Sequence, residues 1–160
     1  MKQSTKENII ILPDIRSSYN VGSIFRTADT AGISKIFLVG YTPCPEDRFK
    51  RANKEIAKTA LGAEKTVVWE HIDDIFPLLE KLRKEGFQII AVEQAENSTD
   101  YKNVKLKDKN AFLFGSEVSG APKEVLEKCD VVAEIPMRGI KESLNVSVAV
   151  GVALFRMCEI

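Results

Sequence analysis

The chain has 160 residues, of which 44% are hydrophobic and 29% carry a charge. These values are ordinary for a globular protein, and we expect one domain over residues 1–160 with a sizeable core. The 23 Lys and Arg residues balance the 23 Asp and Glu residues. The overall charge therefore gives no indication of a nucleic-acid partner, although a local basic patch is compatible with one.

Three cysteines, Cys44, Cys129 and Cys158, are widely spaced and form no CxxC pair. The sequence therefore indicates neither a zinc site nor a disulfide framework. Scattered cysteines of this kind are typical of a reducing compartment. Only four aliphatic residues stand in a row before Pro13, too few for a signal peptide or a membrane span. We expect a cytoplasmic protein that does not enter a membrane.

The first forty residues predict a strand, a helix and a second strand. Large aliphatic residues predict a buried strand over residues 8–12, which ends at Pro13. Apolar residues at helical spacing predict a helix over residues 20–31, with Asn20 as its cap. A second apolar run predicts a strand over residues 35–40. This order is typical of a parallel sheet.

The rest of the chain continues the alternation of strands and helices. Residues 41–63 are mixed and charged, and no regular element is predicted there. We expect strands over residues 66–69, 88–92, 111–114 and 131–135, and helices between Asp74 and Gly86, over 122–128 and over 144–157. The last helix is apolar nearly all round, which is typical of a core or an interface. The pattern favours a doubly wound, Rossmann-like α/β sheet with ligands at the carboxyl ends of its strands.

Two polar segments attract attention because each lies beside a predicted buried element. In NVGSIFR (residues 20–26), Arg26 lies almost opposite the apolar stripe; taken alone, this segment is more simply explained by a solvated arginine and a capping asparagine than by site residues. FGSEVSG (residues 114–120) is a turn rich in Gly and Ser that could present backbone N–H groups to a ligand. It lacks the spacing of a dinucleotide motif or a P-loop, and a tight turn with an exposed Glu117 is the alternative.

A third polar segment, residues 135–147, joins the last strand to the last helix. Ser143 and Asn145 could cap that helix by accepting hydrogen bonds from its first turn. Capping needs only one such residue, and it does not explain the neighbouring Arg138 and Lys141.

Five of the eleven residues in the segment 48–58 are basic. Basic runs of this kind usually form a solvent-exposed surface, and the alternative is that this one binds RNA. His71 is the only histidine, so we expect neither histidine catalysis nor a histidine-rich metal site.

Together, the three polar segments resemble the motifs of the SpoU (TrmH-like) RNA methyltransferases of the SPOUT superfamily. NVGSIFR, FGSEVSG and IPMRGIKESLNVS (residues 135–147) occur in the family's order, and the similarity covers nearly the whole chain. The resemblance implies a parallel-sheet, Rossmann-like α/β core with a deep C-terminal trefoil knot, which the apolar pattern alone does not suggest. It implies a homodimer that binds S-adenosyl-L-methionine in the knot and methylates a ribose 2′-hydroxyl of tRNA or rRNA.

The resemblance also implies roles for particular residues. The catalytic candidates are Arg26, Asn20, Glu117, Ser143 and Asn145. The candidates for the cofactor cradle are Glu93, Gly115, Ile135, Met137 and Leu144. No separate RNA-binding domain is expected, so RNA would be held by the core itself, through Arg16, Arg48, Lys50, Arg51, Arg138 and Lys141. The chain departs from the family at Ser116, where members often have asparagine.

The implied reaction needs alignment of an oxygen with the methyl group and removal of a proton, and it requires no metal. Arg26 would be a poor base because the guanidinium pKa lies above roughly 12. Whether it acts as a base or holds a phosphate that orients the ribose stays open. Two alternatives are a base-methylating enzyme of the same superfamily and a catalytically idle module that binds RNA or cofactor. The intact SLN sequence at residues 143–145 favours ribose.

Overall fold

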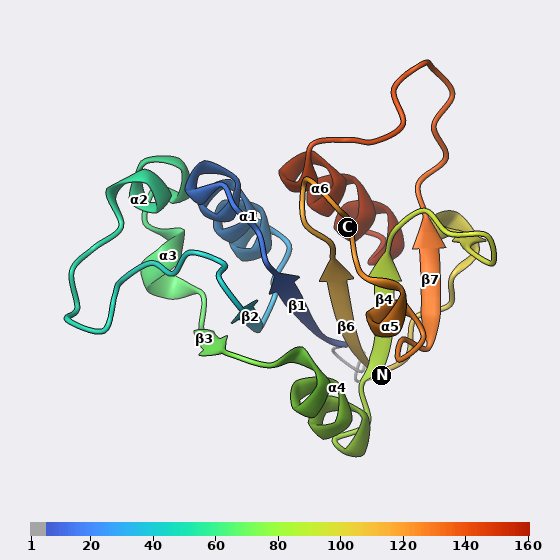
Figure 1. Ribbon diagram of the computed structural model, residues 1–160, viewed down its shortest axis with the longest axis horizontal. Coiled ribbons are helices and arrows are strands. Elements are labelled where there is room, and N and C mark those ends of the chain that lie inside the picture. The colour runs from blue at the N-terminus through green and yellow to red at the C-terminus, as the bar shows by residue number, and fades with distance from the viewer. Residues whose placement is uncertain (1–5) are drawn as a thin grey trace.

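The computed structural model describes residues 6–160 and is built around a seven-stranded sheet, in the order β3-β2-β1-β6-β4-β7-β5 (Figure 1). The strands are β1 Glu7–Pro13, β2 Lys35–Val39, β3 Trp69–Ile72, β4 Gln88–Val92, β5 Thr99–Asp100, β6 Lys109–Phe114 and β7 Val131–Glu134. Every neighbouring pair is parallel. The predicted parallel α/β sheet is therefore confirmed, and the loops that follow the strands share one edge.

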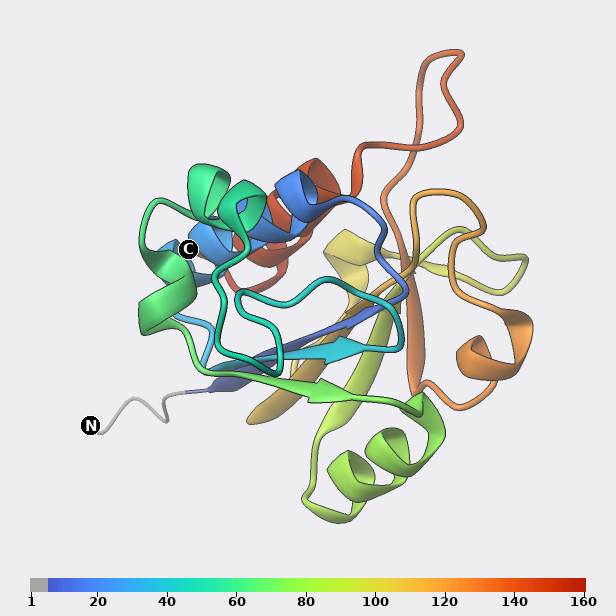
Figure 2. The ribbon, with the colours of Figure 1, turned by 60° about the vertical axis from the view of Figure 1, so that its left-hand side comes forward.

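Helices cover both faces of this sheet (Figures 1 and 2). They are α1 Ser18–Thr30, α2 Lys54–Ala60, α3 Ala63–Thr66, α4 Ile75–Lys84, α5 Lys123–Leu126 and α6 Val146–Met157, with a 3₁₀ turn η1 at Tyr101–Asn103. Alternate residues of β1 serve the two faces, because side chains along a strand point to opposite sides. Ile10 and Leu12 pack with α1 and α6, whereas Ile9 and Ile11 pack with α4. None of these helices, among residues 6–160, could cross a membrane.

The first helix starts earlier than predicted and has a different cap. It begins at Ser18, and the Ser17 hydroxyl accepts the hydrogen bond from the Asn20 N–H at 3.1 Å. The prediction that Asn20 caps this helix was wrong, since Ser17 already satisfies the first turn. The Asn20 side chain is left to make contacts outside the helix.

The segment from residue 54 to residue 72 departs most from the prediction. It contains α2, which was not predicted, and the strand expected over residues 66–69 lies at Trp69–Ile72 instead. A short helix occupies Ala63–Thr66, and Val67 packs into the core from its C-terminal end. The two valines at 67 and 68 resemble a strand in sequence, but only the first of them is buried.

The last helix begins at Val146 rather than at residue 144. The Asn145 side chain caps it by accepting hydrogen bonds from the N–H groups of Ser147 at 2.9 Å and Val148 at 3.4 Å. Ser143 lies before the cap and takes no part in it, which leaves this hydroxyl available at the edge of the sheet.

Gly22 allows α1 to approach α2 closely, and we expect Gly22→Ala to destabilise the fold. An added Cβ would clash with the Thr59 hydroxyl and the Ile56 carbonyl oxygen, and would lie 3.1 Å from the Ala60 nitrogen. Overpacking of this kind should lower the free energy of unfolding by about 1–3 kcal/mol, measured by urea denaturation. The matched control is Gly151→Ala in α6, where the added carbon meets only the Thr27 Cγ2 at 3.9 Å. Equal stability of the two variants would contradict the prediction.

Candidate active site

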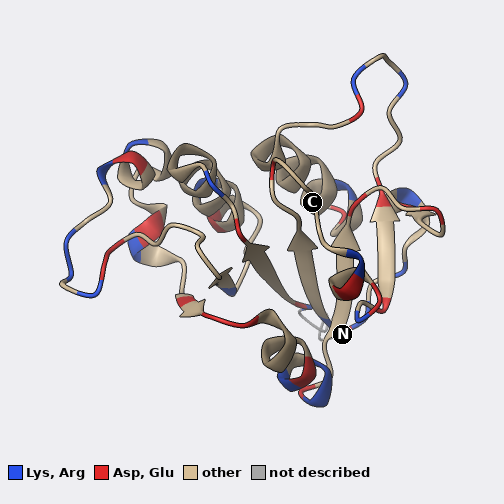
Figure 3. Cartoon of the chain, in the orientation of Figure 1, with Lys and Arg blue, Asp and Glu red and all other residues tan. Residues whose placement is uncertain are grey.

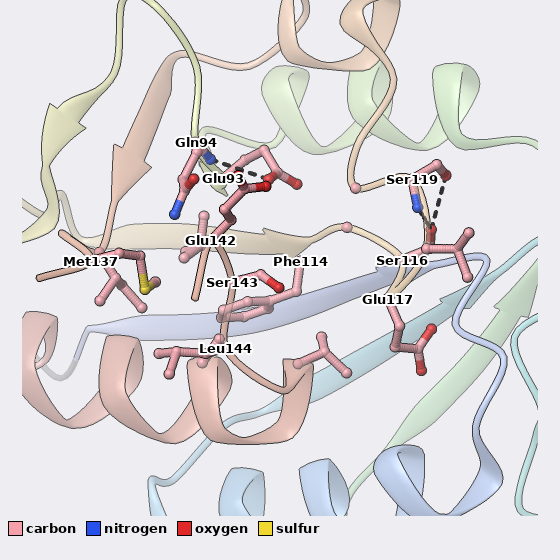
Figure 4. A pocket seen from close by; sticks show the side chains of 17 residues that line it. Glu93, Gln94, Phe114, Ser116, Glu117, Ser119, Met137, Glu142, Ser143 and Leu144 are labelled. Atoms are coloured by element: carbon pink, nitrogen blue, oxygen red, sulfur yellow. Dashed lines mark hydrogen bonds between the residues drawn. The ribbon is translucent and has the colours of Figure 1, made fainter. Parts of the chain in front are cut away.

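A cavity of about 390 Å³ opens at the carboxyl ends of β4, β6 and β7 (Figure 4). Its volume is within the range of small-molecule pockets, about 300–1,000 Å³. Its walls are Val92, Glu93, Gln94, Phe114, Gly115, Ser116, Glu117, Val118, Ser119, Gly120, Ile135, Met137, Glu142, Ser143, Leu144, Val146 and Ala149. All five residues expected to cradle a cofactor are in this set, and of the catalytic candidates Glu117 and Ser143 line it.

The Glu93 carboxylate holds the turn after β6 closed over the end of β4. Its Oε2 accepts a hydrogen bond from the Ala121 N–H at 3.0 Å, and its Oε1 accepts one from the Gln94 N–H at 3.1 Å. A Cβ on Gly115 would lie 2.8 Å from Glu93 Oε2, and one on Gly120 would lie 2.7 Å from it. The carboxylate thus fills the space that side chains at both glycines would need, and Gly120 also has a left-handed φ of 65°.

Ser116 is bonded within the same turn. Its Oγ lies 3.1 Å from the Ser119 Oγ and accepts a hydrogen bond from the Ser119 N–H at 3.3 Å. Its carbonyl oxygen accepts the Gly120 N–H at 3.0 Å. The serine therefore has a structural part in closing the turn.

A chain of side-chain hydrogen bonds joins all three polar segments singled out in the sequence. The Asn20 Nδ2 donates to the Glu117 Oε1 at 3.2 Å, and the Asn145 Nδ2 donates to the Asn20 Oδ1 at 3.2 Å. Glu117 also accepts hydrogen bonds from the backbone N–H groups of Arg16 at 3.1 Å and Ser17 at 3.3 Å. This Asn20–Glu117–Asn145 network fixes the start of α1, the turn after β6 and the start of α6 relative to one another.

The network lowers the pKa of the Glu117 carboxyl group. Burial is the largest single influence and raises the pKa, but hydrogen bonds from three backbone N–H groups and from Asn20 together outweigh it. A carboxyl group whose pKa is lower in the folded chain adds stability above its unfolded pKa. That stability is lost as the pH falls through the folded value.

We therefore expect the wild type to lose part of its stability advantage over Glu117→Gln as the pH drops below about 4.5, the ordinary value for this group. At neutral pH the wild type should have the larger free energy of unfolding, and the gap should narrow in acid. Urea denaturation of both proteins across pH 3–7 measures this gap. A gap that stays constant over the whole range would show that ionised Glu117 does not stabilise the fold.

The cavity combines an apolar floor with acidic walls. Phe114, Met137 and Leu144 supply apolar surface. The charged residues in its lining, within the described part of the chain, are all acidic: Glu93, Glu117 and Glu142. Such a cavity suits a ligand that carries positive charge beside an apolar group, and it disfavours phosphate.

One catalytic candidate, Arg26, does not reach the cavity. It is exposed on α1, six residues after Asn20, which corresponds to ~9 Å along the helix axis. A single chain therefore brings Asn20, Glu117, Ser143 and Asn145 together at one edge of the sheet, and it leaves Arg26 apart from them.

The basic residues expected to contact RNA do not line the cavity, and they lie in separate places along the carboxyl ends of the strands. Arg138 and Lys141 lie on the exposed segment between β7 and α6, which projects beyond the sheet (Figure 3). Arg48, Lys50 and Arg51 lie on the exposed loop between β2 and α2. Arg16 follows β1 and lies between these two regions along the sheet edge.

Several residues that line the cavity were not among the candidates. They are Val92, Gln94, Phe114, Ser116, Val118, Ser119, Gly120, Glu142, Val146 and Ala149. Phe114 ends β6 and Gln94 follows β4 by two residues, so the rule that parallel sheets bind ligands at strand carboxyl ends could have identified both. Among the described residues, no group of three or more His, Cys, Asp and Glu side chains is arranged to hold a metal ion.

The chain is similar to known proteins in both sequence and fold. The sequence model of the SpoU rRNA Methylase family matches residues 7–155. A Staphylococcus aureus protein, named as a member of the TrmH family of tRNA/rRNA methyltransferases, is 31% identical over 159 residues. That match covers 98% of this chain and 61% of the relative. The chain thus spans about three fifths of the length of the curated relatives that it matches.

Solved structures share the fold. The AdoMet-bound rRNA methyltransferase from Sinorhizobium meliloti superimposes with a TM-score of 0.85 at 30% identity, over 96% of this chain and 56% of that one. The A. aeolicus TrmH/SpoU tRNA modifying enzyme gives 0.83 at 27% identity, over 96% and 75%. A structure concerned with 2-OH methylation of C/U34 on tRNA gives 0.82 at 26% identity, over 97% of this chain and 96% of that one. The resemblance inferred from the motifs is confirmed.

Proposed function

Since the chain belongs to the SpoU rRNA Methylase family, we propose that it transfers a methyl group from S-adenosyl-L-methionine to a ribose 2′-hydroxyl of tRNA or rRNA. The observation that carries this proposal is the meeting of the three motif segments at one acidic cavity, joined by the Asn20–Glu117–Asn145 network. The tRNA 2-OH methylation structure, matched over nearly its full length, supports ribose as the acceptor and these 160 residues as one methyltransferase unit.

The residues around the cavity fit this cofactor. When bound, S-adenosyl-L-methionine supplies a methyl group activated on a positively charged sulfonium. Glu93 and Glu142 would offset positive charge on the ligand, while Phe114, Met137 and Leu144 would contact its apolar parts. The Glu93 carboxylate occupies the space beside Gly115 and Gly120 that a side chain at either glycine would need. The turn after β6 therefore keeps one shape, against which a ligand would pack.

The protein's part in the reaction is alignment. Asn145 and Glu117, held through Asn20, would keep the cavity rim rigid, and the Ser143 hydroxyl at that rim would hydrogen-bond the incoming ribose. Transfer would form the bond from the ribose oxygen to the methyl carbon, break the bond from that carbon to the cofactor sulfur, and release the hydroxyl proton to water. Arg26 is a poor base, so we assign to it the binding of an adjacent phosphate, which orients the 2′-hydroxyl.

We propose a homodimer in which Arg26 of the partner subunit completes the site. Two observations support it: Arg26 lies apart from the cavity of its own chain, and α6 leaves Val148 and Val152 exposed at 49% and 36%. Exposed valines on a helix whose other face is buried are typical of an interface. Light scattering after size-exclusion chromatography should give about twice the chain mass of 17.8 kDa. A mass equal to one chain at micromolar concentration would contradict the dimer.

We also propose the deep C-terminal trefoil knot of the family. In support, α6 follows β7 in sequence but packs against α1, so the intervening residues cross the ends of β4 and β6 (Figure 1). Stretching the unfolded chain from its two termini tests this proposal. A tightened knot should leave the chain shorter than the full contour of ~3.5 Å per residue, whereas full extension would exclude a knot.

The proposed function is tested by incubating the purified chain with methyl-labelled S-adenosyl-L-methionine and total RNA, followed by nucleoside analysis. Label in 2′-O-methylnucleosides is the expected result. Label in a methylated base would replace the proposal with a base methyltransferase. Cofactor binding without transfer to any RNA would make the chain a binding module. We also propose that the protein is cytoplasmic, which cell fractionation checks.

A further inference from the structure

A second structured turn lies in the loop between β2 and α2, at the carboxyl ends of the strands like the cavity. Residues 46–52 form a turn, here called the Phe49 turn, in which Glu46 and Ala52 pair as an antiparallel bridge. The Asp47 Oδ1 accepts hydrogen bonds from the N–H groups of Phe49 at 2.8 Å and Arg51 at 3.0 Å. The Asp47 Oδ2 accepts the Arg51 Nε–H at 2.7 Å. The turn is therefore held in one shape by its own contacts.

The turn presents an aromatic ring to solvent. Phe49 is 64% exposed and belongs to neither hydrophobic cluster of the core. The guanidinium carbons of Arg48 and Arg51 lie 4.8 and 5.1 Å from the centre of its ring. A ring flanked by arginines and held away from the core contributes little to folding, whereas it offers a surface on which a nucleic-acid base would stack.

An open groove of about 810 Å³ separates the turn from the end of β2 and from Trp69 and His71 of β3. Arg48 and Arg51 line it on the side of the turn, and Tyr41, Trp69 and His71 line it on the side of the sheet. Tyr41 is 61% exposed. The groove thus places aromatic rings and guanidinium groups around one space large enough for a nucleotide.

Residues 46–52 carry three basic side chains, Arg48, Lys50 and Arg51, against the two acidic ones of Glu46 and Asp47, so the turn has a small net positive charge. Asp47 is neutralised by its ion pair with Arg51. Within the described chain, Arg48 and Lys50 form no ion pair. Free basic groups beside exposed aromatic rings are the combination that binds single-stranded nucleic acid, through phosphates and stacked bases respectively.

The Phe49 turn is connected to the candidate active site. The Asn53 Nδ2 donates to the Ser18 Oγ at 3.1 Å, and the adjacent Ser17 N–H donates to Glu117. The strands β2 and β4 are three places apart in the sheet, ~14 Å, and the loop that carries the Phe49 turn projects beyond β2 on the side away from β4, so RNA would have to span more than this strand separation (Figure 1). A short stretch of unpaired RNA would reach from one to the other.

We propose that the Phe49 turn binds an unpaired nucleotide of the RNA, near the one that is methylated, by stacking its base on Phe49 and holding its phosphate with Arg48. The inference rests on the proposed function and deepens it, because it makes the substrate single-stranded at this point. A loop of tRNA or rRNA would bind, and a continuous duplex would not, since paired bases are not free to stack on the protein.

Phe49→Ala tests the stacking, with Phe76→Ala as the matched control. Phe76 is a second exposed phenylalanine, 41% accessible, on α4. The probe is a fluorescent, unstructured mixed-sequence RNA oligonucleotide, with its affinity measured by anisotropy. Phe49→Ala should weaken binding about ten-fold or more, while Phe76→Ala should bind like the wild type. On the same oligonucleotide made without bases, Phe49→Ala should bind as the wild type does.

Arg48→Gln tests the phosphate contact. It should reduce the slope of log affinity against log salt by about 0.7, the value for one phosphate contact on a single strand, while Phe49→Ala leaves the slope unchanged. Equal losses for Phe49→Ala on RNA with and without bases would overturn the stacking. Competition by poly-glutamate as strong as that by RNA would also overturn the inference, because this polymer has charge and no bases.

The methyl-transfer assay separates this inference from the proposed function. Transfer to RNA with the same KM in wild type and Phe49→Ala would overturn the role of the turn and leave the proposed function intact. A raised KM in Phe49→Ala, with unchanged affinity for S-adenosyl-L-methionine, supports both. If the wild type neither binds nor methylates RNA, the proposed function fails and this inference fails with it.

Discussion

Arg26→Ala should reduce the rate constant of methyl transfer by about 10²- to 10³-fold while leaving the Kd for S-adenosyl-L-methionine near the wild-type value. Arg26 is exposed and does not line the cavity, so its truncation removes no contact from the cofactor cradle. Its backbone carbonyl oxygen accepts a hydrogen bond from Thr30, which the substitution keeps. Single-turnover kinetics measures the first quantity and calorimetric titration the second.

Arg26→Lys is the control for charge. Lysine keeps one positive charge but lacks the planar group that binds a phosphate through two hydrogen bonds, so we expect an intermediate rate. An Arg26→Ala protein that no longer binds the cofactor would mean that Arg26 belongs to the cofactor site. A protein that transfers methyl groups at the wild-type rate would remove Arg26 from the reaction.

Mixing two inactive variants tests whether Arg26 acts across the dimer. Arg26→Ala and Asn145→Ala homodimers should each be inactive. In a heterodimer with two-fold symmetry, one site carries both changes and the other carries neither. Random exchange of subunits should therefore restore about a quarter of wild-type activity. An equal mixture that stays inactive after exchange would place Arg26 and Asn145 in the site of the same chain.

Gly115→Ala should abolish detectable cofactor binding. The added Cβ would clash with the Ala121 nitrogen, and it would lie 2.5 Å from the Gly120 carbonyl carbon and 2.8 Å from the Glu93 Oε2. Backbone atoms cannot retreat as the end of a flexible side chain can, so the whole turn that walls the cavity must shift. We expect a loss of affinity of about 100-fold or more, with a lower Tm, since overpacking also destabilises.

Gly139→Ala provides the comparison for stability. Its added carbon would meet no atom within 4 Å, so its Tm should match that of the wild type. Calorimetric titration and thermal unfolding of Gly115→Ala and Gly139→Ala separate a local effect on the turn from a general cost of replacing glycine. Wild-type cofactor affinity in Gly115→Ala would mean that the ligand does not contact this turn.

The central strands could be predicted because both faces of a parallel sheet are covered. Such strands are continuous apolar runs, and the predicted range 88–92 coincides with β4. The strand predicted over residues 35–40 extends only one residue beyond β2. Cover on both faces also explains why β1, β2, β4 and β6 contain all of the buried strand residues except Ala133 of β7.

The outermost strand β3 and the neighbouring helix α2 could not be predicted so well. Helix α2 buries only Ile56 and Ala60, which is too few residues to give a periodic signal among so many charges. Strand β3 pairs with a single neighbour, and none of its residues is fully buried. At such positions neighbouring elements, and not the local sequence, determine where the strand lies.

The contacts within the candidate site were beyond pattern analysis altogether. Asn20 bonds with Glu117 and Asn145, which are 97 and 125 residues further along the chain. Periodicity describes neighbours in sequence and carries no information on such pairs. Only the resemblance to a family placed the three segments in one site, and it did not identify the bonds between them.

The Asn20–Glu117–Asn145 network has a consequence for biogenesis. Contacts between residues so distant in sequence form late, because the entropy of closing the intervening loops must be lost before they stabilise anything. During synthesis, Asn20 and the strands around it leave the ribosome long before Asn145 and α6. A nascent chain can therefore build most of its sheet without the rim of its cavity. Competence to bind the proposed cofactor would then arise only once the last helix has docked, so a partly made chain would not transfer methyl groups.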